Sequence, residues 1–353
     1  MAVRIVTDSS SDFDPAVAKR RQVELVSMPI QFGKATFLDG KSINGEVFYK
    51  LLKEGKENPS TSQPTPSDFL KVFERAKAAG DQVVAVLLSS VLSGTIQSAM
   101  LAREMCDYDQ IYIVDSLSAT AGIQILVNHA CKLRDSGLKA PDIVSELEHI
   151  KGRIRIFAAI ETLEYLRRGG RLSALQAGLG TVTKLKPVIA VRDGAVAVAA
   201  KAFGTAAATK QLLKFITDHP VDDTFPSYFL YTDDKTREEL LLPRLRELGA
   251  LPQRLHYCCI GATIGTPLAP GAFGLASIEQ DGCPTAHKRA SPAEHTPPGT
   301  LFRFSSPAAR ELSPGGHPQQ PQGQKAQQQP IAQGAEHFFH SITSQRSCSR
   351  SGR

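Results

Sequence analysis

The chain has 353 residues, of which 42% are hydrophobic and 22% charged, values typical of a folded protein with room for two domains. Its net charge of +6 comes mainly from the last 71 residues, because residues 1–282 hold 33 Lys and Arg against 32 Asp and Glu. Total charge therefore does not favour a nucleic-acid-binding face on the folded part. The sequence contains no apolar run of 18 residues and no secretory signal pattern, so we expect a cytoplasmic protein without an integral membrane segment.

Apolar runs alternate with helical periodicity through the first part of the chain. The expected elements, in chain order, are a strand at 3–7, a helix at 67–79, strands at 83–88 and 111–115 separated by a helix at 95–105, and helices at 120–134 and 141–151. Ser67 is a candidate N-cap for the first helix and Gly80 its stop signal. This alternation predicts a parallel sheet covered by helices.

The second part of the chain mixes hairpin and helix signals. The expected elements are strands at 155–160, 187–191, 195–199, 227–232 and 256–264, and helices at 162–168, 206–218 and 235–248. Arg192, Asp193 and Gly194 form a hairpin turn signal between two of the strands. The sheet is therefore expected to be mixed, and the fold class is α/β in two domains, one parallel and one mixed.

The expected boundaries are an N-terminal α/β domain at 1–153, a C-terminal α/β domain at 154–282 and a low-complexity tail at 283–353. The tail holds nine prolines and nine glutamines in 71 residues, a composition that cannot offset the entropy of ordering, so we predict disorder. A basic functional arm is the alternative. The abrupt change in composition also fits an altered reading frame.

Three polar loops rich in Ser and Thr lie at or near the ends of apolar strands, at 7–12, 60–66 and 89–99. Ligands of open α/β sheets bind outside the carboxyl ends of the strands, and hydroxyls ahead of a helix N-terminus can hold an anion. Ser93 and Gly94 are placed to contribute. Ordinary helix capping explains each loop singly, whereas three loops in one domain favour an anion site.

Another feature, residues 163–173, carries three arginines around a Gly-Gly turn. The arginines could complement a helix C-terminus, or they could meet an anionic ligand or an acidic partner. The sequence has no P-loop, no G-x-G-x-x-G after the first strand and no nucleophile elbow. Its histidines and cysteines form no metal-ligand spacing, so neither a metal nor a cofactor is expected.

Seven segments, taken together and in order, resemble the DegV family of bacterial fatty-acid-binding proteins, the carrier subunits of fatty acid kinase. They are VTDSSSD at 6–12, TSQPTP at 61–66, SSVLSGTIQSA at 89–99, VDS at 114–116, LEYLRRGGRLS at 163–173, KP at 186–187 and PGAFG at 270–274. The resemblance covers about residues 3–280.

This resemblance implies a long-chain fatty acid in a buried tunnel, with its carboxylate presented to a separate kinase catalytic subunit that makes an acyl-phosphate for phospholipid synthesis. The carrier itself is then not an enzyme. The carboxylate would be held by Thr61 and Ser93, and the residues assigned to that site are Thr61, Ser62, Ser93, Gly94 and Thr266. We assign Arg167, Arg168 and Arg171 to the kinase partner or the acyl-phosphate. Segments 119–126 and 172–185 are candidate tunnel walls.

The sequence departs from the family pattern near its C-terminal motif. The family usually has G-T-H-x-G-P-G, whose His joins the carboxylate network, whereas here Pro267 stands in place of the His and Ala269 in place of a Gly. Proline donates no hydrogen bond. Two other hypotheses remain: a small-molecule transferase or hydrolase that uses the Ser-rich loops, and a regulatory or nucleic-acid-binding protein that uses the arginines and the basic tail.

Overall fold

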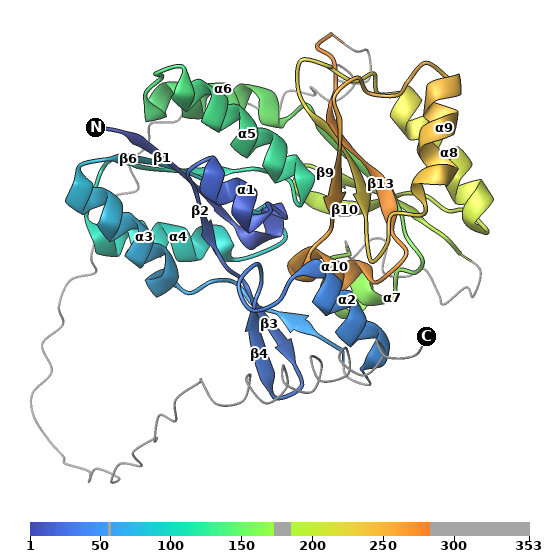
Figure 1. The fold of residues 1–353 in the computed structure, drawn as a ribbon, viewed down its shortest axis with the longest axis horizontal. Helices are drawn as coiled ribbons and strands as arrows, with labels where there is room; N and C mark the ends of the chain where they lie inside the picture. Colours follow the sequence, from blue (N-terminus) through green and yellow to red (C-terminus); the bar gives the residue numbers. More distant parts are fainter. Residues whose placement is uncertain (56–57, 173–184, 283–353) are drawn as a thin grey trace, which may run out of the picture. The chain divides into compact units, whose positions relative to one another are not determined.

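The computed structural model describes residues 1–55, 58–172 and 185–282. Its main elements are two sheets that follow one another along the chain, with helices around and between them (Figure 1). The expected α/β class, with a parallel sheet first and a mixed sheet second, is confirmed. The predicted disorder of residues 283–353 lies outside the described residues, and the two-domain boundaries stay a prediction.

The first sheet is parallel throughout, with the strand order β2-β1-β6-β7. Its strands are β1 (Val3–Asp8), β2 (Val23–Val26), β6 (Gln82–Leu87) and β7 (Ile111–Asp115). One face packs against α3 (Pro66–Ala79) and α4 (Thr95–Cys106), and the other against α1 (Pro15–Arg20), α5 (Ala121–Asp135) and α6 (Ala140–Lys151). Because both faces are covered, β6 is apolar and buried along nearly its whole length.

The ends of α3 show which local signals determine a helix. Gly80 is the C-cap in the left-handed conformation, as expected. The N-cap is Thr65, whose side chain and that of Asp68 form a capping box, so the expectation that Ser67 caps this helix is wrong. Pro66 explains the difference, since proline is favoured at the first helical position and Thr65 directly precedes it.

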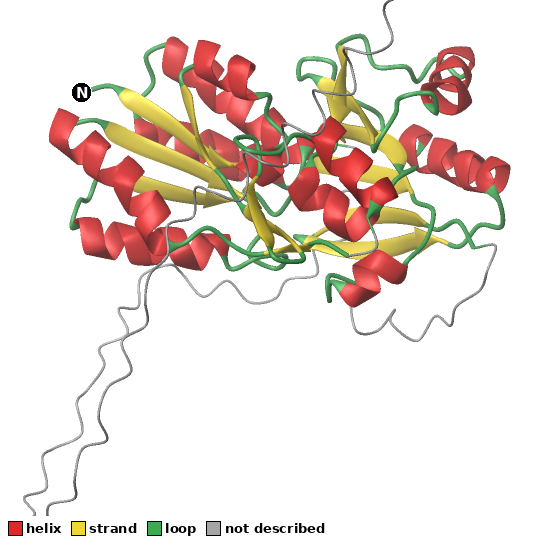
Figure 2. Ribbon diagram, turned by 60° about the horizontal axis from the view of Figure 1, so that its bottom comes forward, coloured by secondary structure: helices red, strands yellow, loops and turns green. Residues whose placement is uncertain are grey.

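The second sheet is mixed, with the order β10-β9-β8-β13-β11-β12, and only β11 and β12 are parallel neighbours. Its strands are β8 (Ile154–Ala159), β9 (Val188–Arg192), β10 (Ala195–Ala200), β11 (Ser227–Tyr231), β12 (Leu255–Cys259) and β13 (Phe273–Ile278). Helices α8 (Thr205–Thr217) and α9 (Glu238–Glu247) cover its outer face, and α5 packs on the inner face (Figures 1 and 2). The predicted β9–β10 hairpin is confirmed, with positive φ at Asp193 and Gly194.

A small third sheet is absent from the sequence-based expectations. It has the order β4-β3-β5, from β3 (Pro29–Phe32), β4 (Ala35–Leu38) and β5 (Ser60–Thr61), and it packs with α2 (Gly45–Glu54) and α10 (Ala262–Leu268). The expected strand at 256–264 ends at Cys259, and the chain then turns at Gly261 into α10, so that part of the expectation is wrong. The remaining elements are the one-turn helix η1 (Ser9–Ser11) and α7 (Glu164–Arg168).

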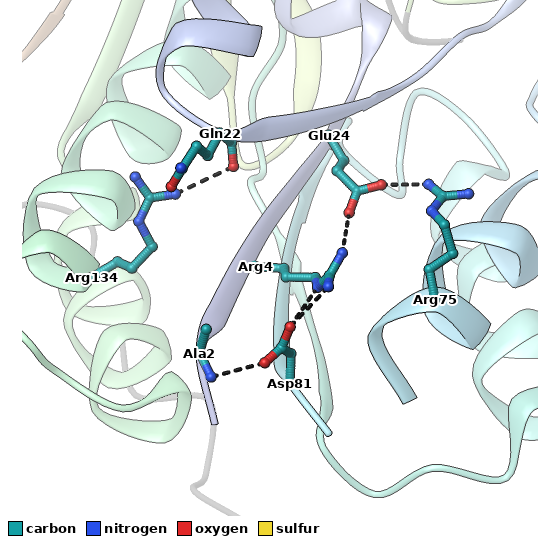
Figure 3. Close-up of polar contacts among 7 residues, drawn as sticks. All are labelled: Ala2, Arg4, Gln22, Glu24, Arg75, Asp81 and Arg134. Carbon is teal, nitrogen blue, oxygen red and sulfur yellow. Dashed lines mark hydrogen bonds and ion pairs between the residues drawn. The ribbon is translucent and has the colours of Figure 1, made fainter. Parts of the chain in front are cut away.

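Charged side chains join the amino ends of the parallel strands (Figure 3). Arg4 pairs with Asp81 at 2.9 Å and with Glu24 at 3.3 Å, and Arg75 pairs with the same Glu24 at 2.5 Å. These groups are partly exposed, so each pair contributes little to stability. They occupy the edge opposite the carboxyl ends of the strands, where the polar loops lie.

Candidate functional site

The carboxyl ends of β1 and β6 mark the point where the strand order of the parallel sheet changes direction. From β1 the chain continues to β2, which pairs with β1 on one side. It later returns to β6, which pairs with β1 on the other side. Open α/β sheets bind ligands at such switch points. The loop after β6 carries Ser93, and β5, which ends in Thr61, pairs with β3.

An apolar cavity of about 90 Å³ adjoins these two loops. Its apolar walls come from the mixed sheet, from α10 and from the segment before α5, and they include Ala119, Ile156, Ala158, Ile189, Val191, Val196, Leu230, Ile264 and Leu268. Its polar lining consists of Thr61, Ser62, Gln63, Ser93, Thr120, Arg171 and Thr263. The described lining contains no histidine and no carboxylate. The cavity is therefore an apolar chamber with hydroxyl groups in its wall.

The structure brings together most of the residues predicted for carboxylate binding. Thr61, Ser62 and Ser93 all line the cavity, although they come from two loops about 30 residues apart in the sequence. The Ser93 Oγ lies 2.8 Å from the Thr95 Oγ1 and accepts a hydrogen bond from the Thr95 N–H at 3.3 Å. This arrangement fixes the Ser93 side chain at the start of α4.

Gly94 and Thr266 do not line the cavity in the described residues. Gly94 is the N-cap of α4, and a Cβ at this position would overlap the Gln63 side chain, which donates to the Ser98 Oγ at 3.1 Å. Gly94 therefore lets the two polar loops approach each other. The Thr266 hydroxyl donates to the Ala262 carbonyl one turn earlier in α10, at 2.8 Å.

The candidate tunnel walls are placed only in part. Of segment 119–126, Ala119 and Thr120 line the cavity, whereas Ile123 and Leu126 belong to the hydrophobic core around α5. Of segment 172–185, residues 173–184 lie outside the described residues. The mixed sheet, whose strands carry no sequence signal for ligand binding, supplies much of the apolar wall.

The two departures from the family motif lie at the end of α10. Pro267 lies inside the helix and lines the cavity. Ala269 follows the helix with φ +64° and ψ 174°. Glycine adopts this conformation freely, whereas a residue with a Cβ adopts it only at a cost in free energy. A non-glycine residue in this conformation costs about 1–3 kcal/mol, so Ala269 introduces strain at the end of α10.

The three arginines of residues 163–173 divide into two groups. Arg167 and Arg168 are exposed on α7, and both pair with Glu164, at 2.7 and 2.8 Å. Arg171 follows the Gly-Gly turn and lines the cavity. Only Arg171 is therefore placed to meet a ligand in this cavity.

The first polar loop, at 7–12, does not line the cavity in the described residues. Asp8 is buried and accepts hydrogen bonds from the backbone N–H groups of Ser10 and Leu88, at 2.9 and 2.8 Å. It ties the end of β1 to the end of β6. Burial raises the pKa of this carboxyl group above its ordinary value. Of the three polar loops expected to form one anion site, only those at 60–66 and 89–99 line this cavity.

Asp12 has an unfavourable environment for its charge. Desolvation by the surrounding protein raises its pKa well above the ordinary 3.8, the Thr120 hydroxyl and the Gly261 N–H offset part of this, and the charge of Asp39 adds to it. A carboxyl group whose pKa is raised in the folded state binds more protons there than when unfolded. Its contribution to stability therefore falls as the pH rises from 3.8 through the raised value.

Replacing Asp12 with asparagine is expected to stabilise the protein at about pH 8, because the amide oxygen still accepts from the Gly261 N–H and carries no buried charge. The gain should disappear at about pH 4, near the ordinary pKa. Urea unfolding at both pH values measures it. Asp81→Asn is the matched control with the opposite sign, since the Ala2 N–H and the Arg4 guanidinium lower the pKa of Asp81. An Asp12→Asn protein less stable than wild type at about pH 8 would contradict this account.

The fold is that of an α/β protein with a parallel sheet followed by a mixed sheet, and an apolar cavity adjoins the loops that carry Thr61 and Ser93. The family model described as "Uncharacterised protein, DegV family" matches residues 2–280. A DegV domain-containing protein of Caldanaerobacter subterraneus is 35% identical over 279 residues, 77% of this chain and 97% of that relative. The chain belongs to the DegV family.

Solved structures of DegV family proteins are also similar to this chain. A Thermus thermophilus structure, described as fatty acid binding of a DegV family protein, has a TM-score of 0.72 at 30% identity and covers 79% of this chain and 100% of its own. DegV from Bacillus subtilis, described as a fatty acid binding protein, has a TM-score of 0.68 at 26% identity, with 79% and 100% covered.

Within the described residues, no helix is long and apolar enough to cross a membrane. The same part of the chain contains no group of three or more His, Cys, Asp or Glu residues that could hold a metal ion.

Proposed function

We propose that this protein binds a long-chain fatty acid, with the acyl chain in the apolar cavity and the carboxylate held by Thr61, Ser62 and Ser93. The observation that carries the proposal is the meeting of two hydroxyl loops with an apolar chamber. Each buried methylene contributes about 0.8 kcal/mol, and a buried carboxylate is costly unless it is hydrogen-bonded. The cavity wall offers apolar side chains and hydroxyl groups, and the relatives described as fatty-acid-binding support this choice of ligand.

The small volume of the cavity limits how an acyl chain can enter it. Ligand pockets are usually roughly 300–1,000 Å³, whereas this cavity measures about 90 Å³. An acyl chain of many carbons therefore enters only if side chains of the wall move apart.

We further propose that the bound acid is presented to the catalytic subunit of a fatty acid kinase in the bacterial cytoplasm, for acyl-phosphate and then phospholipid synthesis. Arg171 supports this part, because it is exposed and also lines the cavity. The Arg171 guanidinium would stabilise the charge of a phosphoryl group that is transferred to the carboxylate. The alternative of a hydrolase or transferase gains no support from the described cavity lining, which offers Ser93 no histidine or carboxylate as a base.

Replacing Arg171 with alanine is expected to lower acyl-phosphate formation by about 10- to 100-fold in the presence of purified kinase and ATP, while the affinity for palmitate stays within about twofold. Arg75→Ala is the matched control, since Arg75 is exposed, pairs with Glu24 at the opposite edge of the parallel sheet and does not line the cavity. Turnover and palmitate affinity are measured on the same preparation. Equal losses of turnover and of palmitate affinity in Arg171→Ala would mean that this arginine belongs to the carboxylate site instead.

A further inference from the structure

The first turn of α10 is held by two carboxylates from the N-terminal part of the chain. The Gly261 N–H donates to the Asp12 Oδ1 at 2.9 Å. The Thr263 N–H and hydroxyl both donate to the Asp39 Oδ2, at 3.1 and 2.5 Å. These bonds join residues that are 249 and 224 positions apart in the sequence, and Asp39 is only 5% exposed.

Asp39 is itself fixed by the small third sheet. It follows β4 directly, and its backbone N–H donates to the Met28 carbonyl at 3.0 Å. Tyr49 of α2 adds another anchor, because its hydroxyl donates to the Ile260 carbonyl at 2.9 Å, just before α10 begins. The start of α10 is therefore joined by hydrogen bonds to the β3, β4 and α2 layer.

The same helix forms one wall of the cavity. Thr263, Ile264, Pro267 and Leu268 all line it. Any displacement of the first turn of α10 moves these four side chains together, since they belong to one short helix. Sites lose function when their supporting residues allow shifts on the order of 1 Å.

We propose that Asp39 is a positioning residue of the fatty-acid site: by fixing the Thr263 hydroxyl and backbone, it sets the position of the α10 wall against the acyl chain. This inference rests on the proposed function. A second consequence concerns Thr263 itself, whose hydroxyl proton is committed to Asp39. Thr263 then cannot donate that proton to the carboxylate of the ligand, which leaves this role to Thr61 and Ser93.

Asp39 is a costly residue to bury. Burial disfavours the charged form of Asp39 and raises its pKa, so an apolar residue in this position would avoid that cost. The carboxylate is instead an acceptor that receives both donors of Thr263. Its presence in a buried position is explained by the wall that it holds.

The test uses the delipidated full-length protein and palmitate as the probe. Asp39→Ala and Thr263→Val are each expected to weaken palmitate binding by about 5- to 10-fold, and the double variant by no more than the stronger single change, because both remove one interaction. Thr263→Ser keeps the hydroxyl and should bind within about twofold of wild type. Asp81→Asn breaks an ion pair at the far edge of the sheet and should leave the affinity unchanged.

The outcomes separate the two proposals. If wild type binds no palmitate, the proposed function fails. If wild type binds and Asp39→Ala binds equally well, the positioning role is wrong. Multiplicative losses in the double variant would show that Asp39 does not act through Thr263. An equal loss of affinity in Asp81→Asn would mean that general destabilisation, rather than position, determines the effect. Should Asp39→Ala fail to fold, the Thr263→Val and Thr263→Ser pair decides.

Discussion

Replacing Ser93 with alanine is expected to weaken fatty-acid binding by about 10- to 100-fold. A hydrogen bond to a charged group is worth roughly 1.5–3 kcal/mol, and the Ser93 hydroxyl is one of few donors in the cavity wall. Thr61→Val, which keeps the shape and removes the hydroxyl, should have an effect of similar size. Competition with a fluorescent fatty acid measures both affinities.

Ser90→Ala is the matched control for Ser93→Ala. Ser90 lies in the same loop and its hydroxyl donates to the Asp115 Oδ2 at 2.5 Å, but it does not line the cavity. This variant should lose some stability and keep its affinity. If Ser93→Ala and Ser90→Ala bind equally well, the carboxylate is held elsewhere.

Replacing Pro267 with histidine is expected to raise fatty-acid affinity or acyl-phosphate formation by about 10- to 100-fold. Pro267 lines the cavity where the family motif has its histidine, so an imidazole here could donate to the carboxylate as a third partner. The Thr266 hydroxyl does not take over this role, because it donates to the Ala262 carbonyl. Ligand competition and kinase turnover on the same preparation give both quantities.

Pro267→Ala separates the imidazole from the effect on the helix. Both substitutions restore a backbone N–H inside α10, and an interior proline costs a helix about 3 kcal/mol, so both variants should be more stable than wild type. Only the histidine variant should gain affinity or turnover. Equal behaviour of the two variants would mean that an imidazole has no role in this protein.

The parallel sheet is predictable from the sequence because its signals are local. Continuous apolar runs such as residues 83–88 are typical of strands covered on both faces, and Gly80 stops a helix through its own backbone freedom. The parallel arrangement then brings the strand ends to one edge. For this reason the sequence predicts the place of the loop that carries Ser93. The meeting of this loop with Thr61, which lies in β5 of the small third sheet, is implied only by the family resemblance.

The α10 wall and its anchors cannot be predicted in this way. The strands of the small third sheet are four residues or fewer, and the bond between Asp39 and Thr263 joins segments that no local pattern connects. The sequence pattern places Asp8 and Asp12 in a polar loop that faces a ligand. The burial of Asp8 and of the Asp12 Oδ2 atom follows from tertiary packing, which gives a carboxylate a neighbour such as Gly261 that the sequence spacing does not reveal.

The central claim is that this protein holds a fatty acid, and mass spectrometry of small molecules extracted from the purified, folded protein tests it most directly. The account predicts a long-chain fatty acid at close to one molecule per chain, and its loss from a variant that carries both Ser93→Ala and Thr61→Val. Recovery of a nucleotide, or of no lipid from folded protein that also fails to take up added palmitate, would contradict it.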